Sequence, residues 1–507
     1  MSPKQYDVIV VGAGNAALCA ALSAREHADN ILVLEKAPAH ERGGNSYFTG
    51  GGFRFAHQGL DDVRRDVLAD LTAAEVAIMD MPPYSADMFY DDLMSVTDSQ
   101  CDEELARTLI GQSRATVSWL QKYRVRWIPM FNRQSHMVGG IHRFYGGLTI
   151  EANGGGAGLV TALFAAAEKQ NIEVRYESCF RRLIQDKTGR VVGVEARGND
   201  GIEKISANAV ILACGGFEAN PEWRARYLGS DWELCRVRGT RHNTGDGLRA
   251  AFELDAEPYG NWSSCHAVAW DISAPPFGDR KVCDGFQKHS YTLGIVVNVR
   301  GERFIDEGAN FRTYTYAKYG REIIKQPQRT AIQIFDGKTL SQLRPEYGIH
   351  EVTKAQANSI SELAKKLEID ADVLNKTISE FNAGCGKGEF NPGVLDGKGT
   401  NGVVPAKSNW AQPIDSPPYV AYVTTCGITF TFGGLHINSK SEVQDTTDKK
   451  IPGLYAAGEM VGGLFYNNYP GGSGLMAGAV FGRIAGSEAA RYAMKIQSVD
   501  SEVNNPI

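Results

Sequence analysis

The stretch YDVIVVGAGNAALCAALSARE, Tyr6 to Glu26, is typical of the start of a dinucleotide-binding fold. An apolar run predicts a short buried strand, and an alanine- and leucine-rich segment after it predicts a helix. Between them Gly12 permits a tight turn, Gly14 lets the backbone approach a pyrophosphate, and Ala17 lets the helix pack closely on the strand. A second predicted strand ends at Glu35, whose carboxylate can accept hydrogen bonds from ribose hydroxyls. This order predicts a nucleotide site rather than an ordinary glycine turn.

The next glycine-rich stretch favours FAD over NAD, although both cofactors share that fingerprint. ERGGNSYFTGGGFRF, Glu41 to Phe55, is a glycine-dense loop where an NAD-binding domain would usually continue with a plain helix and strand. Such a loop lets a flat tricyclic ring lie directly on the backbone. A later cluster beginning at Gly154 precedes a helix without an apolar strand before it, so we expect a packing role there. With one dinucleotide fingerprint, direct use of NADH is not favoured.

The composition indicates a globular protein of two domains with a large bound cofactor. The chain has 507 residues, 43% of them hydrophobic, and its 56 glycines occur in short runs. A net charge of -6 does not favour nucleic acid as a partner. Nine cysteines are scattered without a CxxC pair, which predicts neither structural zinc nor a disulfide framework. We expect a cytoplasmic protein without a signal peptide or a membrane-spanning segment.

Six motifs resemble, in family order, the fumarate reductase and succinate dehydrogenase flavoprotein superfamily. They are VIVVGAGNAALCAAL, GGNSYFTGGG, VILACGGFEAN, NTGDGLRAA, VVNVRGERFIDE, and IPGLYAAGEMVGG followed by NNYPGGSGLMAGAVFGRIAG. The resemblance covers nearly the whole chain. It implies an α/β fold in which a Rossmann-like FAD-binding domain, residues 1–262 and 415–495, is interrupted by an inserted α+β capping domain, residues 263–414. Residues 496–507 are predicted to be a frayed tail.

The same resemblance implies which residues hold the flavin. A helix N-terminus at 472–475 would stabilise the negative charge that collects near N1 of the reduced ring. Glu459 would reach the ribityl chain. Relatives that attach flavin covalently use a histidine where this chain has Asn45, so we expect FAD to be bound non-covalently, and we expect no metal site. The expected cofactor-binding residues are Gly12, Gly14, Ala17, Glu35, Lys36, Gly43, Gly44, Asn45, Ser46, Gly51, Gly52, Gly215, Asp246, Gly458, Glu459, Gly472, Ser473 and Leu475.

Relatives in this superfamily also need a group that carries a proton. They move a hydride between flavin and one carbon of a C–C bond, and a proton between the neighbouring carbon and a side chain. In fumarate reductases an arginine just after the VVNxxGxRF strand carries the proton, and Arg312 is the nearest match, one position later than in the family pattern. An arginine can pass the proton on only with a carboxylate nearby, so Glu307 or another carboxylate close to it would be needed. Tyr314 and Tyr316 are alternative carriers.

Further positions bear on the substrate. His266 lies where the family's cap carries a histidine that helps to hold a substrate carboxylate. Phe430 and Tyr469 replace a histidine and an arginine that bind carboxylates in fumarate reductases. Tyrosine before PGG is similar to 3-ketosteroid dehydrogenases, in which a tyrosine hydroxyl and a backbone N–H, here that of Ser473, hold a ketone oxygen. The expected catalytic residues are Arg312, Tyr469, His266 and Tyr314.

These features predict an FAD-dependent dehydrogenase or reductase of a CH–CH bond next to a carboxylate or a ketone. The strings NAALCAAL, RGGNS, GGFEAN and NYPGGSG most resemble tricarballylate dehydrogenase-like proteins, so a polycarboxylate is the first expected substrate class and a cyclic ketone the second. A flavin oxidase remains an alternative. A flavin protein without turnover is less favoured because His266 and Arg312 are both present. The expected partners are a small-molecule substrate and an unidentified electron acceptor.

Overall fold

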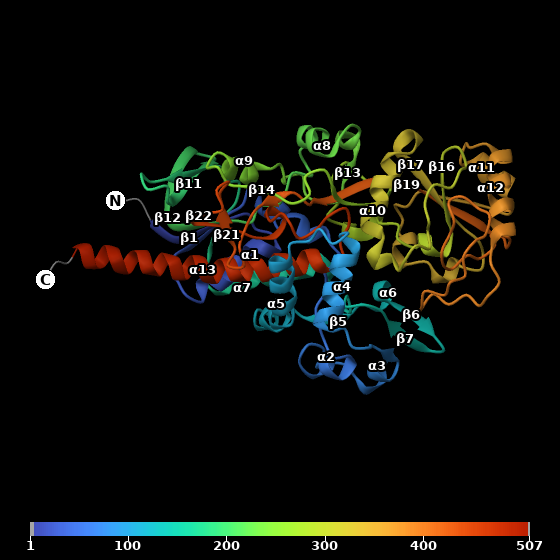
Figure 1. Cartoon of the computed structure of the whole chain (residues 1–507), viewed down its shortest axis with the longest axis horizontal. Helices are drawn as coiled ribbons and strands as arrows, with labels where there is room; N and C mark the ends of the chain where they lie inside the picture. The colour runs from blue at the N-terminus through green and yellow to red at the C-terminus, as the bar shows by residue number, and fades with distance from the viewer. Residues whose placement is uncertain (1–4, 505–507) are drawn as a thin grey trace.

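The computed structural model describes residues 5–504, with side-chain surroundings for 5–498. The molecule is elongated, with two lobes along its longest axis (Figure 1). The described chain begins and ends at the same end of that axis. The first lobe contains the dinucleotide fingerprint, and the second lobe, called the cap below, lies at the opposite end.

The first lobe is built on an eight-stranded sheet with the order β10-β11-β12-β1-β2-β9, to which β22 adds beside β12, and β21 beside β22. β1 pairs in parallel with both β2 and the second half of β12. Residues 6–11 are all buried, as expected for a parallel strand covered on both faces. The strands are β1 (Gln5–Val11), β2 (Ile31–Leu34), β9 (Glu173–Arg175), β10 (Cys179–Gln185), β11 (Val191–Gly198), β12 (Gly201–Leu212), β21 (Glu442–Gln444) and β22 (Lys450–Ala456).

Two helices pack along each other against this sheet. α1 (Asn15–Arg25) follows the glycine turn, and α13 (Ser473–Asn504) comes from the other end of the chain. Gly478, Gly482 and Gly486 are spaced by four residues, so they lie on one face of α13. A Cβ atom on Gly482 would lie 2.4 Å from the carbonyl oxygen of Ala16, and a Cβ on Gly486 2.1 Å from that of Ala20. The helices are therefore closer than any side chain at these positions allows.

Shorter elements complete the first lobe. α2 to α5 extend from it as a helical region beside β4, β6 and β7 (Figure 1). The remaining helices are α2 (Leu60–Asp66), α3 (Ala73–Ala77), α4 (Ala86–Val96), α5 (Glu103–Lys122), α6 (Phe131–Gln134), α7 (Gly155–Lys169), α8 (Pro221–Leu228) and α9 (Asp246–Phe252). The small sheets use β3 (Gly52–Phe53), β4 (Met79–Asp80), β5 (Trp127–Pro129), β6 (Ser135–Val138), β7 (Ile141–Phe144), β8 (Ile150–Ala152), β14 (Pro258–Tyr259) and β20 (Gly434–Leu435).

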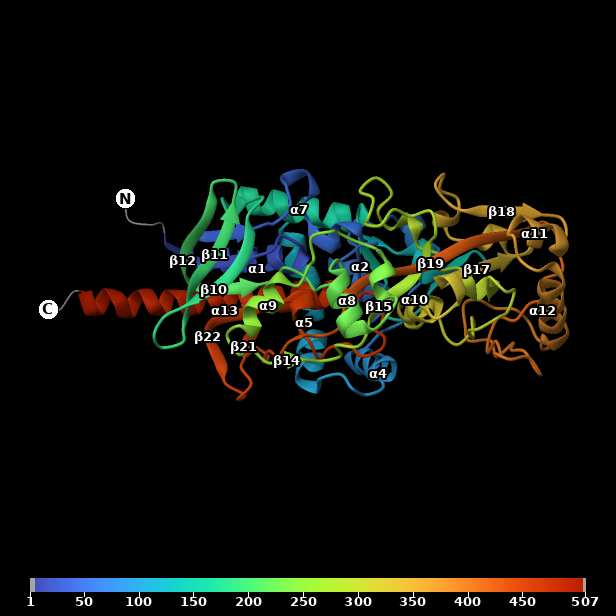
Figure 2. The same cartoon turned by 90° about the horizontal axis from the view of Figure 1, so that it is seen from above.

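The cap is a six-stranded sheet with helices on it. Its longest strand, β19, runs from the outer end of the cap toward the middle of the molecule (Figure 2) and pairs with four others. Two helices of the cap, α11 and α12, have apolar sides that share a core with the sheet. The elements are β13 (Arg236–Val237), β15 (Cys265–Asp271), β16 (Ile295–Asn298), β17 (Thr330–Phe335), β18 (Lys354–Ala357), β19 (Tyr419–Thr431), α10 (Tyr316–Ile324), α11 (Ile360–Lys366) and α12 (Ala371–Gly384).

The structure differs from the predicted segment limits in two places. The cap sheet includes β13 and β19, which lie outside the predicted range 263–414. β19 is hydrogen-bonded to β13 and to three strands from within that range, so all of them belong to one sheet. The segment 496–507 was predicted to be a tail, but α13 continues through it to Asn504, and 505–507 lie outside the described residues. Among the described helices, none has the length and apolar character needed to cross a membrane.

Candidate active site

A long cavity between the two lobes brings most of the predicted site residues together. Its lining contains all of the predicted cofactor residues except Ala17, Gly43 and Ser473. Ala17 is fully buried in α1, which agrees with its predicted role in packing the helix on the strand. The lining also contains three of the predicted catalytic residues, His266, Arg312 and Tyr469.

The turn between β1 and α1 forms one wall of the cavity. Gly12 has a φ of +103°, and a Cβ atom on it would lie 2.5 Å from the carbonyl oxygen of Ala213, so this position requires glycine. α1 has no side-chain cap, and its first residue, Asn15, donates its backbone N–H to Ser46 Oγ at 3.0 Å. An uncapped helix N-terminus that faces a cavity is suited to a phosphate. The geometry at this wall fits the predicted pyrophosphate site.

Acidic and basic side chains gather at the end of the cavity beside β2. Glu35 is buried and accepts a hydrogen bond from the backbone N–H of Ala37 at 2.7 Å, while burial raises the pKa of its carboxyl. Lys36 Nζ lies 2.7 Å from Asp246 Oδ2 and donates to Thr244 Oγ1 at 2.6 Å. This polar end is suited to the ribose and base of an adenosine.

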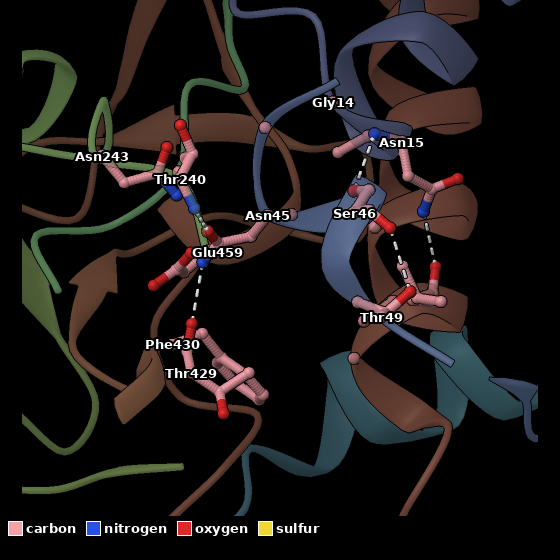
Figure 3. Close-up of a pocket in the computed structure, with 18 of the residues that line it drawn as sticks. Gly14, Asn15, Asn45, Ser46, Thr49, Thr240, Asn243, Thr429, Phe430 and Glu459 are labelled. Carbon is pink, nitrogen blue, oxygen red and sulfur yellow. Dashed lines mark hydrogen bonds between the residues drawn. The ribbon is translucent and has the colours of Figure 1, made fainter. Parts of the chain in front are cut away.

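Asn45 lies in the middle of the cavity with its carboxamide fully hydrogen-bonded. It belongs to the short helix η2 (Gly44–Phe48), and Figure 3 shows it reaching across toward Thr429 of β19. Its Nδ2 donates to the backbone oxygen of Thr429 at 2.7 Å and to Glu218 Oε1 at 2.5 Å, and its Oδ1 accepts from the backbone N–H of Thr240 at 2.8 Å. Asn45 therefore joins the glycine-rich loop of the first lobe to the cap sheet.

Two carboxyl groups lie next to Asn45, those of Glu218, which is fully buried, and Glu459, which is partly buried. Glu459, in the short helix η10 (Gly458–Met460), accepts a hydrogen bond from the backbone N–H of Thr431 at 2.7 Å. Glu218 Oε1 also accepts a hydrogen bond from Asn243 at 2.6 Å. Burial and the charge of Glu459 raise the pKa of Glu218 well above its ordinary range. Burial also raises the pKa of Glu459, so a shared proton between the two carboxyl groups is favoured.

The start of α13 differs from the prediction at Ser473. The backbone N–H of Ser473 donates to the carbonyl oxygen of Pro470 at 3.2 Å, and Ser473 does not line the cavity. It is therefore not placed to hold a ketone oxygen, because the turn that starts the helix already uses this donor. The turn itself is held by Arg54, which is fully buried and donates to the backbone oxygen of Gly471 at 2.8 Å. The sequence analysis did not single out Arg54, since an arginine in a glycine-rich loop has no distinctive spacing.

Aromatic and imidazole groups form one wall of the cavity's cap end. The hydroxyls of Tyr316 and Tyr469 are hydrogen-bonded to each other, and both rings pack against His266. Phe430 packs against His266 and Tyr469 at ring distances of 5.1 and 5.2 Å. Burial, followed by the charges of Arg238 and Arg312, lowers the pKa of His266 well below its ordinary range. Both of its ring nitrogens are buried and without a protein partner, so a neutral imidazole is available to a ligand.

Arg312 and its neighbours require two corrections. Arg312 lines the cavity and donates through Nη2 to the backbone oxygen of Arg133 at 2.8 Å, but Glu307 is not its partner. Glu307 is fully buried and pairs instead with Arg303, four residues earlier in the chain, at 2.5 Å. Tyr314 lies outside the cavity and donates its hydroxyl to Asp92 at 2.6 Å, and Tyr316 takes the place in the lining.

The cap end of the cavity also carries charged groups that sequence reasoning missed. Arg133 and Arg238 line the cavity together with Asp284, which lies in the short helix η4 (Cys283–Phe286). Arg133 Nη1 lies 2.5 Å from Asp284 Oδ2, and Arg238 Nε lies 2.8 Å from Asp284 Oδ1. With Arg312 this end therefore holds three guanidinium groups and one carboxylate. None of the three new residues lies in a family motif, so pattern alone gave no signal for them.

The residues present fit an FAD molecule along the cavity. The fit rests on the uncapped N-terminus of α1, the glycine-rich loop of 43–52 and the polar adenosine end beside β2. Gly51 has a φ of +72°, and a Cβ on it would lie 2.6 Å from the backbone of Gly155, so the loop could not carry a side chain there. The cap end, with its charged and aromatic walls, leaves room for a second, smaller molecule next to the expected ring position.

Known proteins with this arrangement were found by sequence and by structure. Residues 7–475 match a family model described as FAD binding domain. The chain is 29% identical over 495 residues to the fumarate reductase (cytochrome) of Shewanella frigidimarina, covering 96% of this chain and 78% of that protein. It is 27% identical over 525 residues to the vinyl phenol reductase of Lactiplantibacillus plantarum (strain ATCC BAA-793 / NCIMB 8826 / WCFS1), covering 96% and 97%. The open conformation of a flavocytochrome c3 fumarate reductase superposes with a TM-score of 0.72 at 27% identity, covering 97% of this chain and 79% of that one.

Proposed function

Because this chain belongs to the FAD-binding domain family and is an FAD-dependent CH–CH oxidoreductase, we propose that it oxidises or reduces a C–C bond next to a carboxylate, with a polycarboxylate of the tricarballylate type as the first substrate class. The fold class and the superfamily predicted from the six motifs are confirmed. The substrate class is the finer step, and the cap end of the cavity supports it.

The observation that carries the proposal is the excess of positive charge at the cap end. Arg133, Arg238 and Arg312 line this part of the cavity, and Asp284 is the carboxylate among them. Arg238 and Arg312 are each about 7% exposed, so solvent screens their charges poorly. Buried guanidinium groups that outnumber carboxylates need an anionic partner. A substrate with carboxylate groups supplies that partner.

The residues around the reacting bond have separable roles. When bound, FAD supplies the acceptor, or in the reverse direction the donor, of a hydride at one carbon. The neighbouring carbon exchanges a proton with a side chain, and we assign this exchange to Arg312, with Tyr316 as the alternative now that Tyr314 lies elsewhere. Tyr469 and the neutral imidazole of His266 can donate hydrogen bonds to the oxygen that gains negative charge.

The aromatic wall favours a second candidate, a cyclic ketone that bears a carboxylate. Phe430, Phe465 and Tyr469 line the cavity with ring distances of 5.2 to 5.9 Å between them. Such a wall suits a flat ring better than a short polar chain. This candidate keeps the same reaction and changes the group that activates the bond.

Three finer properties belong to the same proposal. FAD is bound without a covalent link, since the position that would carry a histidine is Asn45, whose carboxamide is held by three partners. An electron acceptor, still to be identified, completes the cycle. We place the protein in the cytoplasm because its nine cysteines are all free thiols.

The test is anaerobic mixing of the FAD-loaded enzyme with tricarballylate, succinate, a cyclohexanone carboxylate and a 3-ketosteroid, while flavin absorbance is followed. Dithionite-reduced enzyme is mixed in parallel with the unsaturated counterparts, so both directions are covered. We expect tricarballylate to bleach the oxidised flavin, or its unsaturated counterpart to reoxidise the reduced flavin. Reaction of only the 3-ketosteroid would refute the carboxylate proposal.

Two variants assign the proton carrier in the same assay. Arg312→Gln should slow the reaction at least about 100-fold if Arg312 carries the proton, because positioned acid–base groups contribute about 100- to 10,000-fold. Tyr316→Phe should then retain most of the rate. The opposite ranking would assign the step to Tyr316.

A further inference from the structure

We propose that Arg133, Arg238 and Asp284 form a carboxylate subsite that binds an acidic group of the substrate remote from the bond that reacts. The inference rests on the proposed function and identifies the residues that select the substrate. It moves the main anion-binding position away from Phe430 and Tyr469, where the superfamily's sequence pattern predicts it.

Asp284 organises the subsite by joining side chains from different parts of the chain. Its Oδ1 accepts hydrogen bonds from Nε and Nη2 of Arg238, and its Oδ2 accepts from Arg133 and from Gln287 Nε2 at 2.8 Å. The remaining nitrogen of Arg238, Nη1, donates to Thr429 Oγ1 at 3.1 Å. Arg238 is therefore held on all sides, and its guanidinium plane is set before a ligand arrives.

Arg133 is the member with room for a ligand. Its side chain is 23% exposed, compared with 7% for Arg238 and 6% for Asp284. Its backbone oxygen accepts hydrogen bonds from Arg312 at 2.8 Å and from Arg344 at 3.1 Å, so the residue is also fixed from behind. A carboxylate next to Arg133 can form the charge-assisted pair for which a guanidinium fork is suited.

The charges of the arginines and the buried donors beside them indicate that the subsite binds an anion. Two guanidinium groups share the one carboxylate of Asp284 in ion pairs, and the charges of Glu346 and Glu151 act on Arg133 without an ion pair to it. Next to them, the buried Nε of Arg312 and both ring nitrogens of His266 have no protein partner. Unpaired buried donors are costly, so they point to a ligand that accepts hydrogen bonds.

Gly50 leaves the space that the side chain of Arg133 occupies. A Cβ atom on Gly50 would lie 2.1 Å from Arg133 Nη1 and 3.1 Å from Asp284 Oδ2. Gly50 belongs to the glycine-rich loop of the first lobe, whereas Asp284 belongs to the cap region. The absence of a side chain at residue 50 thus lets the guanidinium pass between the loop and the cap and reach its partner.

The aromatic residues of the cavity cannot replace this subsite as the binding position of a carboxylate. Phe430 carries no donor, and the hydroxyl of Tyr469 is already bonded to that of Tyr316. Neither residue carries a positive charge that could neutralise a carboxylate. Burying a carboxylate without a cation costs on the order of several kcal/mol. A substrate with two acidic groups would therefore place the remote one on the arginine wall.

The experiment measures binding to the oxidised, FAD-loaded enzyme by isothermal titration with two probes. Tricarballylate and 2-methylsuccinate differ because a methyl group in the second replaces one carboxymethyl group of the first. We expect the wild-type enzyme to bind tricarballylate roughly 10- to 100-fold more tightly, the ratio that one charge-assisted hydrogen-bonded pair supplies. Arg133→Gln should bring the two dissociation constants together by weakening tricarballylate alone.

Two further variants control this measurement. Arg133→Lys keeps the charge and should retain much of the preference. Arg280→Gln removes the same charge from the segment that carries Asp284, but Arg280 stacks on Tyr47 outside the cavity, so the full preference should remain. An unchanged preference in Arg133→Gln, or no binding of either probe to the wild type, would overturn the subsite.

Failure of the subsite is distinguishable from failure of the proposed function. If the flavin reacts with a carboxylate of the panel while Arg133→Gln keeps the preference, the reaction stands and the subsite is wrong. If no member of the panel reacts in either direction, the function itself is wrong.

Discussion

Replacing Gly482 with alanine tests whether the close approach of α1 and α13 supports the cofactor site. The added Cβ would lie 2.4 Å from the carbonyl oxygen of Ala16, which lines the cavity. An ordinary contact of this kind is near 3.4 Å, so the helices must separate locally by about 1 Å. The shift acts on the turn that the pyrophosphate is expected to use.

The size of the effect follows from two opposing terms. Overpacking a tight interface costs roughly 1–3 kcal/mol. Replacing glycine by alanine inside a helix returns about 0.5–1 kcal/mol through helix propensity. We therefore expect Gly482→Ala to lower the free energy of unfolding by about 1–2 kcal/mol. Because the unfolding entropy is about 2.1 cal/mol/K per residue, or roughly 1 kcal/mol/K for a chain of this length, the melting temperature should fall by roughly 1–2 °C.

The assay is thermal unfolding of the FAD-loaded protein, followed by circular dichroism and by the fluorescence of released flavin. Gly111→Ala in α5 is the matched control because a Cβ there meets no atom within 4 Å. It should raise the stability by about 0.5–1 kcal/mol and leave flavin release coupled to unfolding. In Gly482→Ala, flavin release should begin below the unfolding transition. If Gly482→Ala behaved like Gly111→Ala, the reasoning about the helix contact would be refuted.

Three other predictions concern protons and hydroxyls. Glu218→Gln should leave FAD content and melting temperature nearly unchanged at pH 7, because burial and the charge of Glu459 raise the pKa of the Glu218 carboxyl well above its ordinary range and so favour the neutral form that glutamine imitates; loss of FAD would contradict this. Tyr469→Phe should lower kcat/KM about 10- to 100-fold with FAD content unaltered, since it removes the hydroxyl that is hydrogen-bonded to Tyr316 in the cavity lining and that we propose donates to the activating oxygen, and wild-type kinetics would rule out that role. Burial lowers the pKa of His57 from 6.5 to about 4, so the unfolded chain binds the proton first as the pH falls, and stability should be lost between about pH 6.5 and pH 4. Urea unfolding at pH 7 and pH 5 should show a smaller pH dependence in His57→Gln than in the wild type, and equal dependence would exclude this histidine as a cause.

The part of the fold and site that lies in contiguous motifs could be predicted from the sequence. Gly12 has a φ of +103°, a local backbone requirement that a short pattern expresses directly. Neighbours across the cavity, such as Glu459, could be placed because each follows a strand of recognisable pattern. The α/β fold class followed from the same local order.

The remaining part depends on contacts between distant segments. Arg133, Arg238 and Asp284 meet only because α6, β13 and η4 come together at the cap end. The choice between Tyr314 and Tyr316 depends on which way a short helix η6 (Arg312–Tyr314) turns, and a two-residue spacing cannot express that. Likewise Ser473 was assigned a free N–H, but the turn from Pro470 uses it.

The pairing of β22 with β12 and of α13 with α1 has a consequence for synthesis on the ribosome. The nucleotide fingerprint emerges before the strand and the helix that cover it, which are made more than four hundred residues later. Until then β12 lacks its neighbour β22, and the face of α1 that packs on α13 is uncovered. Stable capture of the cofactor thus has to wait for these two elements, and a nascent chain held on the ribosome before residue 450 should not retain flavin.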